Sequence, residues 1–182
     1  MIRKSLILIA GVILAFAGFG YWYLHKKAEP ETPVVLHAIQ GLSELATVKY
    51  VMEKVVTHEI EKTFGKDQVL LIAQGVVKAG VDLGKMKNED IRVSAGSVSF
   101  HLPRSEVTDR YLVEKQTFVY DRRTGLFIHP EKNLESQARQ IALGAMLASA
   151  HANGILKDSD DRARVLVTKL SQQLGFKTVE FH

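Results

Sequence analysis

The chain opens with a long uninterrupted run of apolar residues. Leu6–Leu24 contains no charged residue and follows a short basic segment, Met1–Ser5. A helix over this run is roughly 30 Å long, which matches the hydrocarbon core of a bilayer. The pattern predicts a transmembrane helix over residues 6–24. Aromatic and basic residues at its far end are typical of a membrane interface: Tyr21, Trp22, Tyr23, Lys26 and Lys27.

A second interpretation of this segment remains open. Ala15-Phe16-Ala17 has the small-x-small pattern of a signal-peptide cleavage site, and cleavage after Ala17 would release an exported soluble protein. We favour a retained anchor, because the apolar run continues for seven residues beyond Ala17. Basic residues flank both ends of the run, so the charge rule for orientation nearly ties. A span at the extreme N-terminus favours an extracytoplasmic domain.

A short polar link separates the predicted span from the rest of the chain. Residues 25–33 include Pro30 and Pro33, which stiffen such a segment towards an extended form. The link therefore holds the following domain just off the bilayer. Residues 34–182 contain no internal repeat and are numerous enough for one hydrophobic core. We expect a single domain there.

The first half of this domain alternates apolar and polar residues with a period of two. Ala46–Ile60 alternates in this way and predicts a half-buried strand, although its Glu and Lys residues leave a helix as the alternative. Gln68–Val77 is apolar on both faces, as in a central strand. Gly75 and Gly80 interrupt this pattern and suggest a bulge or a close backbone approach. Further strands are predicted at Ile91–Val93, Val98–Leu102, Tyr111–Tyr120 and, after a turn at Asp121–Gly125, at Leu126–Ile128.

The second half changes to a helical period. A helix with Asn133 as N-cap is expected to end at Gly154, and a second helix to run from a Ser159 cap to Gly175. Phe176–Phe181 alternates as a final strand. Strands followed by two helices and a strand indicate an α+β fold with a mostly antiparallel sheet. The apolar stripe of the first helix is read as Leu134, Ala138, Ile141, Ala145, Ala148 and Ala152.

The first of these helices is apolar nearly all round over Gln140–Ala152. Such a helix is buried or lies in an interface, and its small residues allow a neighbour to approach closely. We therefore predict an assembly surface on it, formed by Ile141, Ala145, Met146 and Ala148.

Candidate chemistry adds little to this picture. The 182 residues include no cysteine, which excludes disulfides, thiol catalysis, thiolate metal sites and a lipidated cysteine. His58-Glu59 begins a zinc-protease motif, but Lys62 stands where the second histidine is needed. The other histidines show no metal-ligand spacing, and neither a serine-hydrolase elbow nor a phosphate-binding loop occurs. We therefore expect no metal and no cofactor. A hydrolase with an unrecognised His and carboxylate site stays the alternative to a non-catalytic domain.

The net charge of +4 suggests a nucleic-acid partner until its location is considered. Without Arg3 and Lys4, which precede the predicted span, 22 basic residues face 20 acidic ones. No strongly basic face is visible in the pattern, so the footprint of a phosphate-binding domain is missing. The expected partners are instead the lipid bilayer and either a second copy or another membrane protein.

Three segments together resemble a known family. They are Gly75–Leu83 (GVVKAGVDL), Val98–Val107 (VSFHLPRSEV), and the tail containing HANGIL, DRARVLVTKL and LGFKTVEF. The combination resembles the bacterial membrane-anchored domain of unknown function 4230 family over about Leu42–Phe181. The resemblance implies one membrane helix in the bacterial inner membrane followed by a single α+β domain. It implies no activity and no catalytic residue.

A candidate polar site lies within those segments. Gly80 precedes a turn in which Asp82 is expected to accept hydrogen bonds from backbone amides. His101, Arg104 and Glu106 follow the end of a predicted strand, and with Asp82 they are the polar site that we consider. The alternative is that Asp82 caps a turn and that residues 104–106 begin a solvated loop. The sequence as a whole favours a non-catalytic binding or assembly module at the membrane surface.

Overall fold

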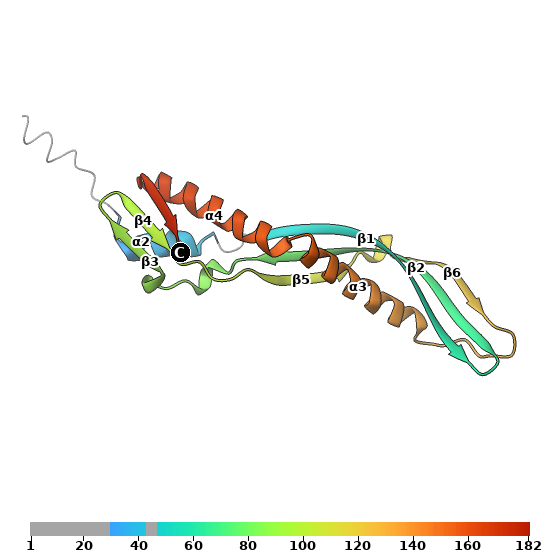
Figure 1. Ribbon diagram of the computed structural model, residues 1–182. Coiled ribbons are helices and arrows are strands. Elements are labelled where there is room, and N and C mark those ends of the chain that lie inside the picture. The colour runs from blue at the N-terminus through green and yellow to red at the C-terminus, as the bar shows by residue number, and fades with distance from the viewer. Residues whose placement is uncertain (1–29, 43–46) are drawn as a thin grey trace, which may run out of the picture.

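Two long antiparallel strands run through most of the molecule in the computed structural model, which describes residues 30–42 and 47–182 (Figure 1). β1 (Thr47–Lys62) and β2 (Gly65–Gly80) pair without irregularity from Thr47 opposite Gly80 to Lys62 opposite Gly65. Sixteen residues give each strand a length of about 50 Å. The strand predicted over Ala46–Ile60 is confirmed and its helical alternative is wrong, because alternate side chains of β1 share one half-buried face.

The other edge of β2 carries two short strands in succession. β5 (Glu106–Leu112) pairs with the end of β2 that contains Gly75, and β6 (Phe118–Thr124) pairs with its beginning. A 3-10 turn, η4 (Glu114–Gln116), separates them. The single strand predicted over Tyr111–Tyr120 is therefore wrong. Its alternating pattern is real, but the two halves pair with different parts of β2.

The predicted turn at Asp121–Gly125 and return strand at Leu126–Ile128 are also wrong. β6 continues to Thr124, and the residues after it form a turn and no strand. The reason lies in two side chains near the end of β6, which both bond to Asp67 of β2. This anchoring keeps β6 paired where the composition suggests a loop.

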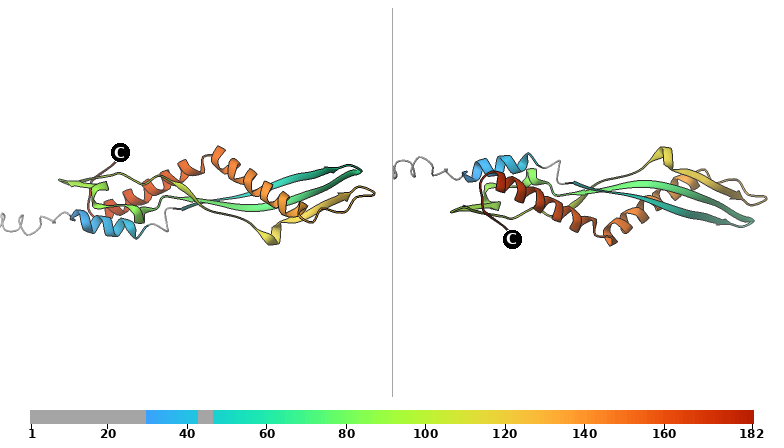
Figure 2. Two further views of the ribbon diagram at one scale, coloured as in Figure 1. Left: turned by 90° about the horizontal axis from the view of Figure 1, so that it is seen from below. Right: turned by 90° about the horizontal axis from the view of Figure 1, so that it is seen from above.

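Two helices cross one face of the long sheet (Figure 2). α3 (Leu134–Ala152) and α4 (Ile155–Gln173) meet at Gly154, whose φ of 83° is readily available to glycine. The prediction that Ser159 caps the second helix is wrong, because Ser159 lies buried inside α4. The predicted end of this helix at Gly175 is confirmed, and Gly175 follows α4 with a positive φ of 101°. The mixed α+β fold with two C-terminal helices and a final strand is confirmed.

The buried face of α3 differs from the predicted stripe. Its buried positions recur every four residues and pack against β1 and β2. Ile141 and Ala148 are exposed, Ala145 is half-buried and Met146 is fully buried. The close approach predicted at Gly75 is confirmed, because a Cβ there would overlap the Met146 sulfur. The buried residues are Leu134, Ala138, Ala142, Met146 and Ala150.

A smaller module stands at the other end of α4, and its sheet comprises three strands. β3 (Ile91–Ser94) and β4 (Ser97–Phe100) form the predicted hairpin, and β7 (Thr178–Phe181) joins β4 in parallel. Two 3-10 turns, η2 (Leu83–Lys85) and η3 (Asn88–Asp90), lead into β3. The core of this module includes Phe100, Val167 and Phe176.

The sequence missed one helix of this module, α2 (Thr32–Gln40). Pro33 suggested an extended link, yet it occupies the first turn of α2, where its missing N–H costs nothing. Val35 and Ile39 lie one turn apart and are fully buried in the module core. α2 is therefore part of the small module.

The predicted membrane segment lies outside the described residues. This applies to residues 6–24 and to the interface residues from Tyr21 to Lys27. Within residues 30–42 and 47–182, no helix is both long and apolar enough to cross a membrane.

Candidate functional site

Lys85 joins two members of the predicted polar site. Asp82 accepts a hydrogen bond from the Gly84 amide at 3.1 Å, as expected of a turn residue. The Lys85 ammonium lies 3.0 Å from a Glu106 carboxylate oxygen and 3.4 Å from one of Asp82. The pKa of Lys85 is raised above its ordinary value, chiefly by the hydrogen bond to Glu106 and by the negative charge of that carboxylate. The hydrogen bond and charge of Asp82 raise it further. All three groups are at least partly open to water.

The other two members lie along an exposed segment. His101 borders a cavity of about 240 Å³ beside η3 and the C-terminal residue His182. Arg104 is exposed in the link between β4 and β5. The four predicted residues therefore do not form one site. Lys85 joins only Asp82 and Glu106, and the cavity beside His101 is lined by none of the other three. In the described part of the chain, no group of three or more His, Asp or Glu side chains has the arrangement of a metal site.

An open groove of about 710 Å³ lies between β5 and the elbow of the two helices. Glu106 from the predicted polar site contributes to its rim. The sequence did not indicate this groove, because its walls are about 40 residues apart along the chain. The lining residues are Ser105–Arg110, Leu147, His151 and Leu156.

The two edges of the long sheet differ in a way that bears on binding. β5 and β6 each have a register shift in their pairing with β2, at Lys78/Ala79 and at Leu70/Leu71 respectively. Such bulges are a common device that prevents an edge strand from pairing with another chain. β1 has no register shift, and β2 is its only strand partner among the described residues. Its outer edge is therefore a regular sixteen-residue template for a further strand.

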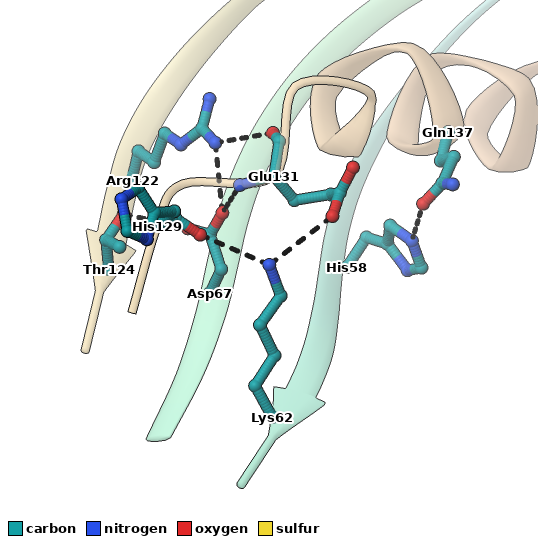
Figure 3. A network of polar contacts seen from close by, with 8 residues as sticks. All are labelled: His58, Lys62, Asp67, Arg122, Thr124, His129, Glu131 and Gln137. Atoms are coloured by element: carbon teal, nitrogen blue, oxygen red, sulfur yellow. Dashed lines mark hydrogen bonds and ion pairs between the residues drawn. The ribbon is translucent and has the colours of Figure 1, made fainter. Parts of the chain in front are cut away.

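Side chains on the half-buried face of β1 attach it to the helical layer. The Tyr50 hydroxyl donates to an Asp158 carboxylate oxygen at 2.6 Å, and that hydrogen bond raises the pKa of Tyr50. His58 Nε2 lies 3.0 Å from Gln137 Oε1 (Figure 3). Lys62 donates to the His129 carbonyl at 3.1 Å. These contacts, spread along β1, attach the strand to the helical layer and to the segment before α3.

The opposite face of β1 is exposed and has a mixed pattern of charge and apolar surface. Val51 and Val55 expose 56% and 63% of their surface. Lys49 stands near one end of the strand and Glu61 near the other. Neither charge takes part in an ion pair among the described residues. The strand thus has opposite free charges at nearly equal distances from Val55.

A buried carboxylate organises the far end of the sheet (Figure 3). Asp67 is inaccessible to water and accepts hydrogen bonds from Arg122 at 3.0 Å, Thr124 at 2.8 Å and the Glu131 amide at 2.6 Å. Burial alone would raise its pKa, but the hydrogen bonds from Glu131, Arg122 and Thr124 outweigh burial and lower it. The role of this network is structural, since it ties β2, β6 and the segment before α3 together.

Comparison with known proteins adds one match. A family model described as "Protein of unknown function (DUF4230)" matches residues 37–181. No curated protein and no solved structure matches the chain. The match covers nearly all of the domain described above, from α2 to β7. The chain therefore belongs to the DUF4230 family of proteins of unknown function.

Proposed function

We propose that this protein is a membrane-tethered, non-catalytic assembly module, and that two copies associate by pairing their β1 strands. The observation that carries the proposal is the regular, unbulged outer edge of β1. A second β1 strand would satisfy the N–H and C=O groups along that edge. Because two copies present the same edge, the simplest closed arrangement is an antiparallel pair about a two-fold axis.

The sequence of β1 is self-complementary about Val55. With the axis at Val55, Lys49 of each copy faces Glu61 of the other, which gives two opposite-charge pairs on the exposed face. Val55 then lies opposite its own copy. On the other face Tyr50 lies opposite Ile60 of the second copy, which is an aromatic and β-branched pair.

The competing registers of comparable length are less favourable. A two-fold axis through residue 53, 54, 55 or 56 pairs nearly the whole strand. Each of these axes keeps opposed side chains on the same face. An axis at Glu53 or at Lys54 places that residue against its own copy, and an axis at Val56 places Glu53 against Glu59. Like charges directly opposite each other destabilise a strand pair. Only the Val55 register combines attractive end pairs with no like-charge contact.

This arrangement is compatible with anchors in a single bilayer. The two-fold axis at Val55 places the small modules, which contain α2, at opposite ends of the pair. If the long strands lie along the membrane surface, the predicted spans over residues 6–24 of both copies reach the same bilayer. We propose that the pair lies there on the extracytoplasmic side of the bacterial inner membrane.

Charge reversal at the ends of β1 tests the pairing. Lys49→Glu or Glu61→Lys alone would place two like-charge pairs in the interface, so either variant is expected to weaken dimerisation about tenfold. The double variant restores two opposite-charge pairs and is expected to recover the dimer. The dissociation constant is measured by analytical ultracentrifugation of the full chain in detergent.

Asp109→Lys on the opposite edge is the matched control, since it also alters charge on an edge strand and is expected to leave the dissociation constant unchanged. A wild-type chain that stays monomeric at high protein concentration contradicts the proposal. So does a double variant that is no better than the single ones, because pairing in another register would not be rescued.

The tether has its own test. We expect the full chain, expressed in bacteria, to keep its N-terminal segment and to stay with the membrane during an alkaline carbonate wash. Intact-mass measurement checks the first point. A mature protein that begins at Gly18 would show that the segment is a cleaved signal peptide and that no anchor remains.

A further inference from the structure

The far end of the long sheet presents three large apolar side chains to solvent. Phe64, Leu126 and Phe127 expose 74%, 80% and 93% of their surface. They come from two loops, the turn between β1 and β2 and the segment after β6. The Gly125 amide donates to the Lys66 carbonyl at 2.9 Å, so the two loops lie side by side. This apolar tip, formed by Phe64, Leu126 and Phe127, is the end of the molecule farthest from α2 and the C-terminus (Figures 1 and 2).

Phe127 in the apolar tip has a strained backbone, and its side chain contributes almost no burial to the fold. Phe127 has a φ of 69° and is the only described residue other than glycine with a positive φ. A bulky side chain in this conformation is strained, and such strain is concentrated at functional positions. Burial of the Phe127 ring does not offset the strain, because the ring is almost entirely exposed. The fold thus holds an apolar group outward that it does not use itself.

A rigid base stands directly behind the apolar tip. Asp67 on β2 is bonded to Arg122 and Thr124 of β6 and to the backbone of Glu131, and Lys62 at the end of β1 bonds to the Glu131 carboxylate (Figure 3). These bonds fix the ends of all three strands from which the two loops emerge. The two loops that carry the three exposed apolar side chains therefore emerge from a fixed end of the sheet.

We infer that the apolar tip inserts into the outer layer of a lipid bilayer, and that this is the bilayer that holds the anchor. Large apolar side chains exposed at one end of a protein can enter the boundary between headgroups and acyl chains, and their transfer out of water favours binding. The nearby charges are paired, Lys66 with Glu59 and Arg123 with Asp121. Binding is therefore expected to depend on apolar transfer and to require no anionic lipid.

The inference rests on the proposed membrane tether, because the tether decides which bilayer is reached. A chain anchored at one end meets the surface of its own membrane at a high effective concentration. The strands between the small module and the apolar tip are about 50 Å long, so the domain lies along the surface when its tip inserts. That orientation is also the one that the proposed β1 pair requires.

The absence of cysteine allows a direct test. Phe127→Cys in the full chain is labelled with the polarity-sensitive fluorophore NBD and reconstituted into phosphatidylcholine vesicles. We expect the emission to be blue-shifted relative to that of a label exposed to water. We also expect a loss of intensity when nitroxide-labelled lipids are included in the same vesicles. Lys115→Cys, in the exposed turn η4 and remote from the tip loops, is the matched control and is expected to show neither change.

The outcomes separate the inference from the tether. A label at position 127 that emits as in water, in vesicles that retain the protein on flotation after a carbonate wash, would overturn the inference and leave the tether intact. Loss of the protein from the vesicles in that wash would overturn the tether. Quenching only by nitroxide lipids in separately added vesicles would assign the apolar tip to a second membrane and would overturn the assignment to its own.

Discussion

Replacement of Asp67 by asparagine is expected to lower the free energy of unfolding by about 2 to 3 kcal/mol. The carboxylate is inaccessible to water and serves three donors, from Arg122, Thr124 and the Glu131 amide. An asparagine keeps one acceptor oxygen and turns an NH₂ group towards these donors. This loss of stability is smaller than that expected when a fully buried ion pair is broken, because the partner Arg122 is one-third exposed and remains partly solvated.

Urea unfolding of the full chain, followed by circular dichroism, measures this loss. Asp109→Asn is the control, since Asp109 also accepts from a basic side chain, Lys78, but is about half exposed. We expect a change below about 0.5 kcal/mol there. Equal losses in the two variants would contradict the structural role of the Asp67 network.

The same carboxylate makes stability depend on pH in the acid range. Its folded-state pKa is lowered from an ordinary value of 3.8, so the unfolded chain takes up a proton at higher pH than the folded one does. The stabilisation by Asp67 is complete above pH 3.8 and is lost as the pH falls below that value through the folded-state pKa. Asp67→Asn is expected to flatten this part of the stability curve, measured by urea unfolding between pH 2 and 6. An unchanged slope would show that other carboxylates dominate.

Gly75→Ala is expected to destabilise the domain by about 1 to 3 kcal/mol, although alanine suits a strand better than glycine. The added Cβ would overlap the Met146 sulfur and lie 3.1 Å from the carbonyl oxygen of Tyr111. The Met146 side chain can move, whereas the β5 backbone is held by its pairing with β2. Removal of the sulfur should therefore relieve only part of the strain.

A double-mutant cycle measures that coupling. Met146→Ala alone leaves a cavity in the α3 core and is expected to cost about 2 to 5 kcal/mol, while the double variant should cost less than the sum of the two. Gly144→Ala is the control, because its Cβ meets nothing within 4 Å and alanine favours a helix. That variant should be slightly stabilising. Simple additivity of Gly75→Ala and Met146→Ala would contradict the close contact.

Much of the fold could be read from the sequence because its elements bury one face. The alternation in β1, the β3–β4 hairpin and the last strand each have a period of two that matches the observed strands. The errors arose where distant contacts decide the outcome. β6 continues to Thr124 because Asp67 lies beside it, and α2 forms because the module core accepts Val35 and Ile39.

The stripe of α3 shows a subtler error. Alanine is apolar enough to be read on either side of a helix, so the sequence pattern did not decide between the faces containing Ile141 and Ala142. The sheet does, because Gly75 makes room for Met146 and thereby fixes the rotation of the helix. The assembly surface predicted from Ile141, Ala145, Met146 and Ala148 stays a prediction, with Met146 occupied in the core of the single chain.

The surfaces that the two proposals use could not be predicted from sequence. Which strand lies at an edge depends on the pairing order, and nothing in residues 47–62 shows that β5 and β6 join the far side of β2. The apolar tip needs two loops about 60 residues apart to meet. The predicted polar residues Asp82 and Glu106, by contrast, are brought together by Lys85 in an open turn.

A single cysteine at Val55 tests the central claim, that two copies pair through β1. Opposed residues in an antiparallel pair have Cα atoms about 4.5 to 5.5 Å apart, within the range of a disulfide. In the Val55→Cys chain, which has no other cysteine, mild oxidation in the membrane is expected to produce a covalent dimer. Thr108→Cys on the opposite edge is expected to give no covalent dimer. Failure of Val55→Cys to cross-link, or equal cross-linking at Thr108, would contradict the β1 pairing.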